Sequence, residues 1–122
     1  MKIVSLIFQI VIALGLINVW VVRFNKKTPF RGGTAQTMRE EFASYGLPQW
    51  AMWGVGGIKL SCAMCLLAGI WLPILVAPAS AIIALLMVGA IVMHFKVRDP
   101  MLKSLPAGIM LALSTFVLGN SI

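Results

Sequence analysis

The sequence predicts an all-α membrane protein, an antiparallel four-transmembrane-helix bundle with a short interfacial amphipathic helix between spans one and two. Of the 122 residues, 61% are hydrophobic and 11% are charged, whereas a soluble domain is closer to half apolar and a quarter charged. Four apolar runs are each about long enough to cross a bilayer. Short links between such runs make neighbouring helices antiparallel. We expect a single domain covering residues 1–122.

The first apolar run covers residues 3–22 and is interrupted only by Ser5, Gln9 and Asn18. A helix of this length is about 30 Å long, which matches the hydrocarbon thickness of a membrane. A secretory signal peptide would have a shorter apolar region and a small-residue cleavage site. The run is therefore expected to be an uncleaved membrane span.

The polar link that follows contains a predicted short helix at about residues 34–45. Thr37 and Glu40 have the spacing of a capping box, and Gly46 can adopt the left-handed conformation that ends helices. The apolar side chains of the segment share one helical face: Met38, Phe42 and Tyr45. Such a helix either lies in the membrane interface or packs on the end of the bundle.

The other three spans are predicted at residues 51–71, 78–95 and 100–119. Trp50 and Trp71 flank the second span, where aromatic residues anchor helices in the interface. Pro78 is expected at the first position of the third helix, which suits proline. Pro106 predicts a mild bend in the fourth, because membrane helices tolerate internal proline.

The formal charge of +7 is explained by membrane orientation. Eight of the ten basic residues fall in the two links expected on one side: Arg23, Lys26, Lys27, Arg31, Arg39, Lys96, Arg98 and Lys103. The other side has Lys2 alone. The positive-inside rule then places these links in the cytoplasm and both termini outside. Nucleic acid is not an expected partner, because no basic face remains once the membrane flanks are removed.

Lys59 lies near the middle of the second predicted span, where an ammonium group is disfavoured by about 2.5–3.5 kcal/mol on insertion scales. It therefore needs a polar partner or a route to water. His94 and Asn18 lie near the same end of the third and first spans, so the three side chains reach a similar depth. They are candidates for a ligand or proton-handling pocket. The alternative is a lysine satisfied by backbone carbonyls and water.

The predicted spans contain no acid, so Lys59 could pair only with Asp99, or with Glu40 and Glu41 if the interfacial helix folds under the bundle. A small-residue ladder on the second span would let another helix, in this chain or in a second copy, approach closely: Gly57, Ser61, Cys65 and Gly69. Lys59 points well over a quarter-turn away from this ladder. If the ladder faces the bundle centre, Lys59 faces lipid or another protein.

Cys62 and Cys65 have the spacing of redox motifs, but they lie mid-span, where an apolar setting disfavours the reactive thiolate. Packing explains Cys65 equally well, since it belongs to the ladder. His94 is the single histidine, so we expect no metal site.

Several short motifs in order resemble the DoxX-like family over nearly the whole chain. They are Gly46-Leu47-Pro48, Gly56-x-x-Lys59-Leu60, Met87-x-Gly89-Ala90-x-x-x-His94 and a fourth apolar run after Pro106. The resemblance implies a four-span bacterial inner-membrane protein. Founding members of that family are subunits linked to thiosulfate oxidation with quinone as acceptor, and others accompany oxidative-stress complexes or the maturation of membrane proteins.

The expected function is a small accessory or redox-associated membrane subunit acting through the pocket around Lys59, His94 and Asn18. Its expected partners are the lipid bilayer and other membrane proteins or a homo-oligomer. The alternative is a quinone-linked oxidoreductase that uses a bound quinone or the pair Cys62 and Cys65.

Overall fold

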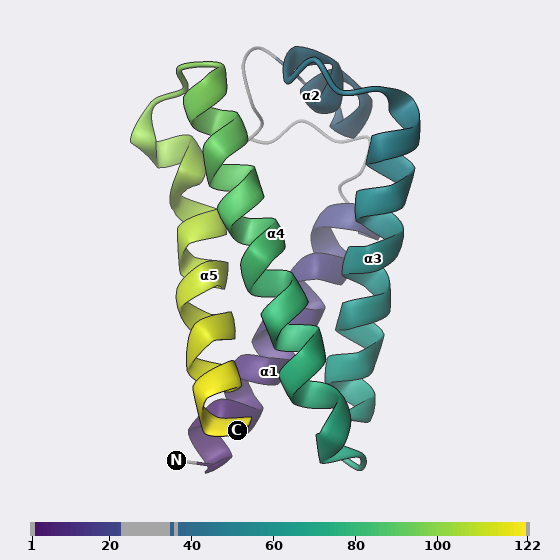
Figure 1. The fold of residues 1–122 in the computed structure, drawn as a ribbon, viewed down its shortest axis with the longest axis vertical. Helices are drawn as coiled ribbons and strands as arrows, with labels where there is room; N and C mark the ends of the chain where they lie inside the picture. Colours follow the sequence, from purple (N-terminus) through teal and green to yellow (C-terminus); the bar gives the residue numbers. More distant parts are fainter. Residues whose placement is uncertain (1, 23–34, 36, 122) are drawn as a thin grey trace.

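Four long helices form an antiparallel bundle in the computed structural model, which describes residues 2–22, 35 and 37–121 (Figure 1). They are α1 (Lys2–Ile17), continued by the π-helical turn η1 (Asn18–Val22), α3 (Gln49–Ala68), α4 (Val76–Lys96) and α5 (Met101–Ser121). Each span is long and apolar enough to cross a membrane. The chain is therefore an all-α, four-span membrane protein. The start of α1 and the end of α5 lie at the same end of the bundle.

The short helix α2 (Met38–Ser44) lies across the opposite end of the bundle (Figure 1). At its start, the Thr37 hydroxyl accepts a hydrogen bond from the Glu40 amide at 3.3 Å. At its end, Gly46 has a φ of 76°, and the Leu47 amide donates to the Phe42 carbonyl at 3.0 Å. This left-handed cap, predicted from the sequence, turns the chain directly into α3.

The connection between α3 and α4 differs from the prediction at both of its ends. The Ile70 and Trp71 amides bond to carbonyls three residues back, so α3 tightens and ends at Ala68. A 3₁₀ turn, η2 (Pro73–Leu75), then leads into α4 at Val76. The prediction that Pro78 is the first residue of this helix was wrong, because α4 already begins at Val76. Pro73 is instead the first residue of the 3₁₀ turn.

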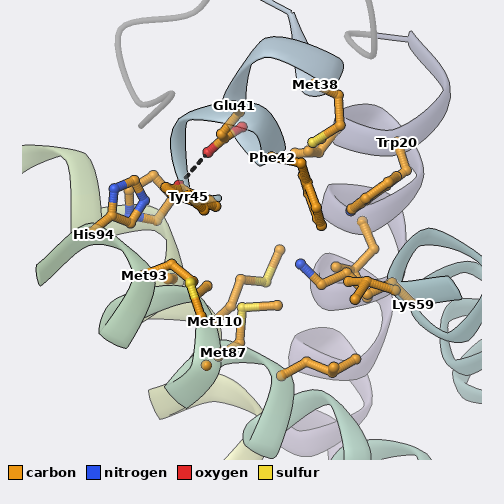
Figure 2. A pocket seen from close by; sticks show the side chains of 18 of the residues that line it. Trp20, Met38, Glu41, Phe42, Tyr45, Lys59, Met87, Met93, His94 and Met110 are labelled. Atoms are coloured by element: carbon orange, nitrogen blue, oxygen red, sulfur yellow. Dashed lines mark hydrogen bonds between the residues drawn. The ribbon is translucent and has the colours of Figure 1, made fainter. Parts of the chain in front are cut away.

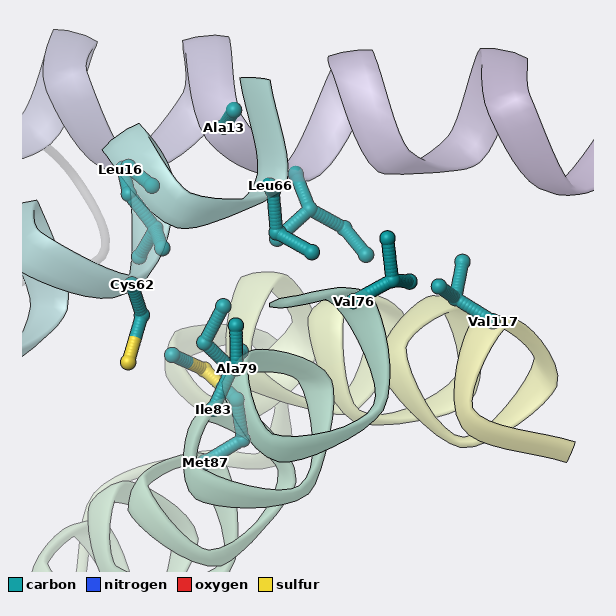
Figure 3. Close-up of a cluster of buried hydrophobic side chains, with 11 residues drawn as sticks. Ala13, Leu16, Cys62, Leu66, Val76, Ala79, Ile83, Met87 and Val117 are labelled. Carbon is teal, nitrogen blue, oxygen red and sulfur yellow. The ribbon is translucent and has the colours of Figure 1, made fainter. Parts of the chain in front are cut away.

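The main apolar core fills the half of the bundle that contains this connection (Figure 3). It is made by four helices: Ile12, Ala13, Leu16, Cys62, Ala63, Leu66, Val76, Ala79, Ile83, Met87 and Val117. A second cluster, Trp20, Met38, Phe42 and Met52, joins α2 to the other end of α1 and α3. The two clusters leave the level between them less completely filled.

The inward face of α3 is the face that carries Lys59. Its neighbours on that face, Met52 and Leu66, are fully buried. Gly57 and Ser61 from the small-residue ladder are exposed, and a side chain built on Gly57 would meet nothing within 4 Å. The alternative in which the ladder faces the bundle centre and Lys59 faces lipid is therefore wrong for this half of the helix.

Candidate functional site

A cavity of about 690 Å³ lies between the two apolar clusters and is lined by all four long helices and α2 (Figure 2). Leu16 and Met87, from the main core, form part of its lining on one side, and Phe42 from α2 forms part on the other. Most lining side chains are apolar. The polar ones are Asn18, Glu41, Tyr45, Lys59, His94 and Lys103. An apolar chamber with a few convergent polar groups is the usual form of a small-molecule site.

Lys59 reaches this cavity from α3, and its ammonium group points into the open space (Figure 2). Its nitrogen lies 5.4 Å from the centre of the Trp20 ring. The ring face is electron-rich and stabilises a desolvated cation by about 2 kcal/mol. Glu41 lines the same cavity and attracts the ammonium group without a contact ion pair. The buried charge is thus compensated by an aromatic face and a carboxylate.

Gly56 allows Trp20 to take up this position. A side-chain carbon built on Gly56 would lie 2.5 Å from the Trp20 ring, which is closer than atoms can approach. The ring therefore packs directly on the backbone of α3, one turn from Lys59. The Gly56-x-x-Lys59 spacing has a structural reason. Gly56 leaves room for the Trp20 ring, and the ammonium group of Lys59 lies over the face of that ring.

His94 lies across the cavity from Lys59, at the end of α4 (Figure 2). Its Nδ1 atom lies 2.7 Å from Asp99 Oδ2, and Lys103 Nζ lies 3.8 Å from Asp99 Oδ1. Arg98 adopts the left-handed conformation with a φ of 58°, and the Asp99 amide donates to the His94 carbonyl at 3.0 Å. This reverse turn folds the Asp99 carboxylate back onto the imidazole.

Tyr45 connects α2 to the end of α4. Its hydroxyl donates to Glu41 Oε1 at 2.8 Å, and its backbone carbonyl accepts from Lys96 Nζ at 2.8 Å. Its ring also packs edge-on against His94, with the ring centres 5.9 Å apart. These contacts hold α2 over the cavity from the α4 side.

The structure brings together most, but not all, of the residues singled out in the sequence. Lys59, His94, Asn18 and Glu41 line one cavity. Glu40 is exposed, and its backbone amide donates to the capping Thr37 hydroxyl at the start of α2. Asp99 contacts His94 instead of Lys59.

The two cysteines lie in the main core instead of the cavity lining. Cys62 is buried in that core, Cys65 packs against it, and both are free thiols. Across the described residues, no three His, Cys, Asp or Glu side chains gather closely enough to hold a metal ion. The polar groups that line the cavity can form hydrogen bonds and charge interactions, and they include Lys59, Tyr45 and His94.

Sequence reasoning missed Trp20 and Tyr45 as parts of the site. The sequence pattern puts Tyr45 on the apolar face of α2, although its hydroxyl gives it a polar tip. Trp20 lies between two valines near the end of an apolar run, where a tryptophan is the ordinary interface anchor. The Gly56-x-x-Lys59 spacing was a usable signal, since a glycine one turn from a buried lysine indicates that something large packs there.

These features define a small multi-pass membrane protein with a largely apolar cavity that holds a few polar groups between its helices. The chain belongs to the DoxX-like family, whose sequence model matches residues 7–117. Neither the curated proteins nor the solved structures include one that matches it.

Proposed function

We propose that this DoxX-like protein is an accessory, redox-associated subunit of the bacterial inner membrane, and that its cavity binds a membrane-soluble ligand. Lys59 and His94 stand at opposite walls of the binding site, and Asn18 lies at its margin. Quinone is the candidate ligand. The molecule dissolves in the bilayer, and its ring carries carbonyl oxygens that can accept hydrogen bonds.

The observation that carries this proposal is a lysine directed into a cavity of about 690 Å³ inside a membrane bundle. Ionisable groups at such depth are costly and tend to mark ligand or ion pathways. Cavities that hold small molecules have volumes of about 300–1,000 Å³. A lysine kept only for packing would not need an open chamber in front of it.

An accessory role also needs a surface that meets other membrane proteins. The exposed Gly57 and Ser61 allow another helix to approach α3 closely, from a partner protein or a second copy. A catalytic variant of the proposal, a quinone-linked oxidoreductase, would use the same bound quinone. The burial of Cys62 in the apolar core favours ligand binding over thiol chemistry.

Replacing Lys59 with Met tests the site, because Met preserves the volume of the side chain and removes the ammonium donors. Loss of a charge-assisted hydrogen bond should weaken decylubiquinone binding about 10-fold to 100-fold. The measurement is a titration of purified protein in nanodiscs, followed by native mass spectrometry.

Arg39→Met is the matched control. Arg39 is an exposed cation whose guanidinium lies 5.6 Å from the centre of the Trp53 ring, outside the cavity lining. Its loss should leave binding unchanged. Equal binding by wild-type protein and a folded Lys59→Met variant would refute the proposed site.

A further inference from the structure

We propose that the cavity takes its ligand sideways from the bilayer, through a portal between α3 and α4 at Leu85 and Gly89, and that the ligand is a single-tailed amphiphile with an uncharged, oxygen-bearing head. The head lies against Lys59 and the tail lies in the portal. This inference rests on the proposed function and names the class of ligand and its route.

The α4 wall of the portal combines cavity lining with exposure. Leu85 lines the cavity and is 74% exposed. Gly89, one turn further on, also lines the cavity and is exposed, and a side chain built on it would meet nothing within 4 Å. A surface that belongs to the chamber and to the outside of the bundle at once is the rim of an opening.

The α3 wall is formed by Val55 and Lys59, which line the cavity at the facing side. Toward the α3–α4 connection, Leu66 and Ile83 of the main core close the gap between the two helices. Toward the other end, α2 closes it with Phe42. The opening is therefore bounded on four sides and lies within the length of the membrane spans.

The portal suits a single apolar tail, because the residues beside it are apolar and exposed. Leu85 and the neighbouring apolar residues of α4, Ile82, Val88 and Val92, are exposed on a helix long and apolar enough to cross the membrane. An apolar tail leaving beside Gly89 would stay in hydrocarbon while its head remained in the cavity. The other exposed lining residues, Asn18 and Val19, lie on the first span, in its last turns.

An uncharged head is favoured because each cation of the cavity already has an acidic residue near it that compensates its charge. Lys103 lies 3.8 Å from Asp99, and Glu41 attracts Lys59. A further full charge in this setting would lack compensation. Trp20 contacts the ammonium charge through its ring face, and an ammonium has three N–H donors, so Lys59 can still donate to a carbonyl or hydroxyl oxygen.

The test uses Gly89→Phe, whose ring takes up the space that the tail of the bound ligand needs in the portal, with Gly57→Phe as the control, and binding is measured at equilibrium. Gly57 is also exposed with open space around it, and it lies outside the cavity lining. Two probes are compared in nanodiscs: decylubiquinone, and the same dimethoxy-methyl-benzoquinone head without a tail. Gly89→Phe should weaken decylubiquinone binding about tenfold and leave the tailless head nearly unchanged, while Gly57→Phe should change neither.

Unchanged decylubiquinone binding by Gly89→Phe would overturn the portal, and so would an equal loss of both probes. These results leave the proposed function standing if Lys59→Met still weakens binding. As a second measurement, wild-type protein is photo-crosslinked to a quinone carrying a diazirine in its tail. Labels in α3 and α4 near Val55 and Leu85 support the portal, and labels confined to α1 and α5 refute it.

Discussion

Trp20 and Gly56 illustrate how single residues place the charge of this protein. A tryptophan ring can lie beside Lys59 only because the residue one helical turn earlier has no side chain. The adjacent Gly57 is exposed, and a side-chain carbon built on it would meet nothing within 4 Å. Two neighbouring glycines therefore have different roles: Gly56 admits the Trp20 ring, and Gly57 is exposed.

Gly56→Ala is expected to displace the Trp20 ring, because the added methyl would overlap it at 2.5 Å. Overpacking of this kind costs about 1–3 kcal/mol. Thermal unfolding in detergent should show the loss, and Trp20 fluorescence should shift. Gly57→Ala is the control, and it should be neutral or stabilising by up to about 1 kcal/mol, since alanine favours helix. Equal effects of the two substitutions would contradict the proposed role of the close contact.

At the scale of elements, the ends of the helices are secured by specific hydrogen bonds. The Ile70 amide bonds to Leu67, so the Leu66 carbonyl at the end of α3 needs another donor. The side-chain amide of Gln9, which is buried on α1, provides it. At the other end of the bundle, Arg98 and Asp99 close α4 and orient His94.

Gln9→Leu should destabilise the bundle by about 1–3 kcal/mol, the cost of leaving a buried carbonyl without a donor. The unfolding free energy in mixed micelles measures this loss. Asn120→Leu is the control, because the Asn120 amide bonds to the Phe116 carbonyl at an exposed helix end, where water can replace it. If Gln9→Leu were as stable as the wild type, the Leu66 carbonyl would have to be satisfied by another group.

At the scale of the whole molecule, the basic residues and the cavity lie toward the same end of the bundle. Arg39, Lys96, Arg98 and Lys103 belong to elements at the α2 end, where the helices separate around the cavity. The opposite end is closed by the main apolar core. The polar side of the cavity therefore lies nearer the strongly basic end of the bundle.

The positive-inside rule predicts that this basic end is cytoplasmic and that both termini are periplasmic. A C-terminal alkaline phosphatase fusion should therefore be active, and a C-terminal green fluorescent protein fusion should be dark. Replacing Lys96, Arg98 and Lys103 with Asn should weaken this preference and give a mixed population. An inactive phosphatase fusion together with a bright fluorescent protein fusion would contradict the proposed orientation.

The number, order and approximate limits of the spans and the left-handed cap at Gly46 could all be predicted from the sequence. Each depends on local hydropathy, length or turn chemistry, which nearby residues determine. The common level of Lys59, His94 and Asn18 stays a prediction, and the three residues line one cavity.

Only the tertiary structure decided which face of α3 is inward, because that depends on the fit between the surfaces of several helices. The Gly56–Trp20 contact turns Lys59 toward the cavity and leaves Gly57 exposed. The pairing of His94 with Asp99 and the attachment of Tyr45 to Lys96 likewise depend on a reverse turn and on contacts between distant segments. Local sequence carries little information about such contacts, because they form only when separate elements pack together.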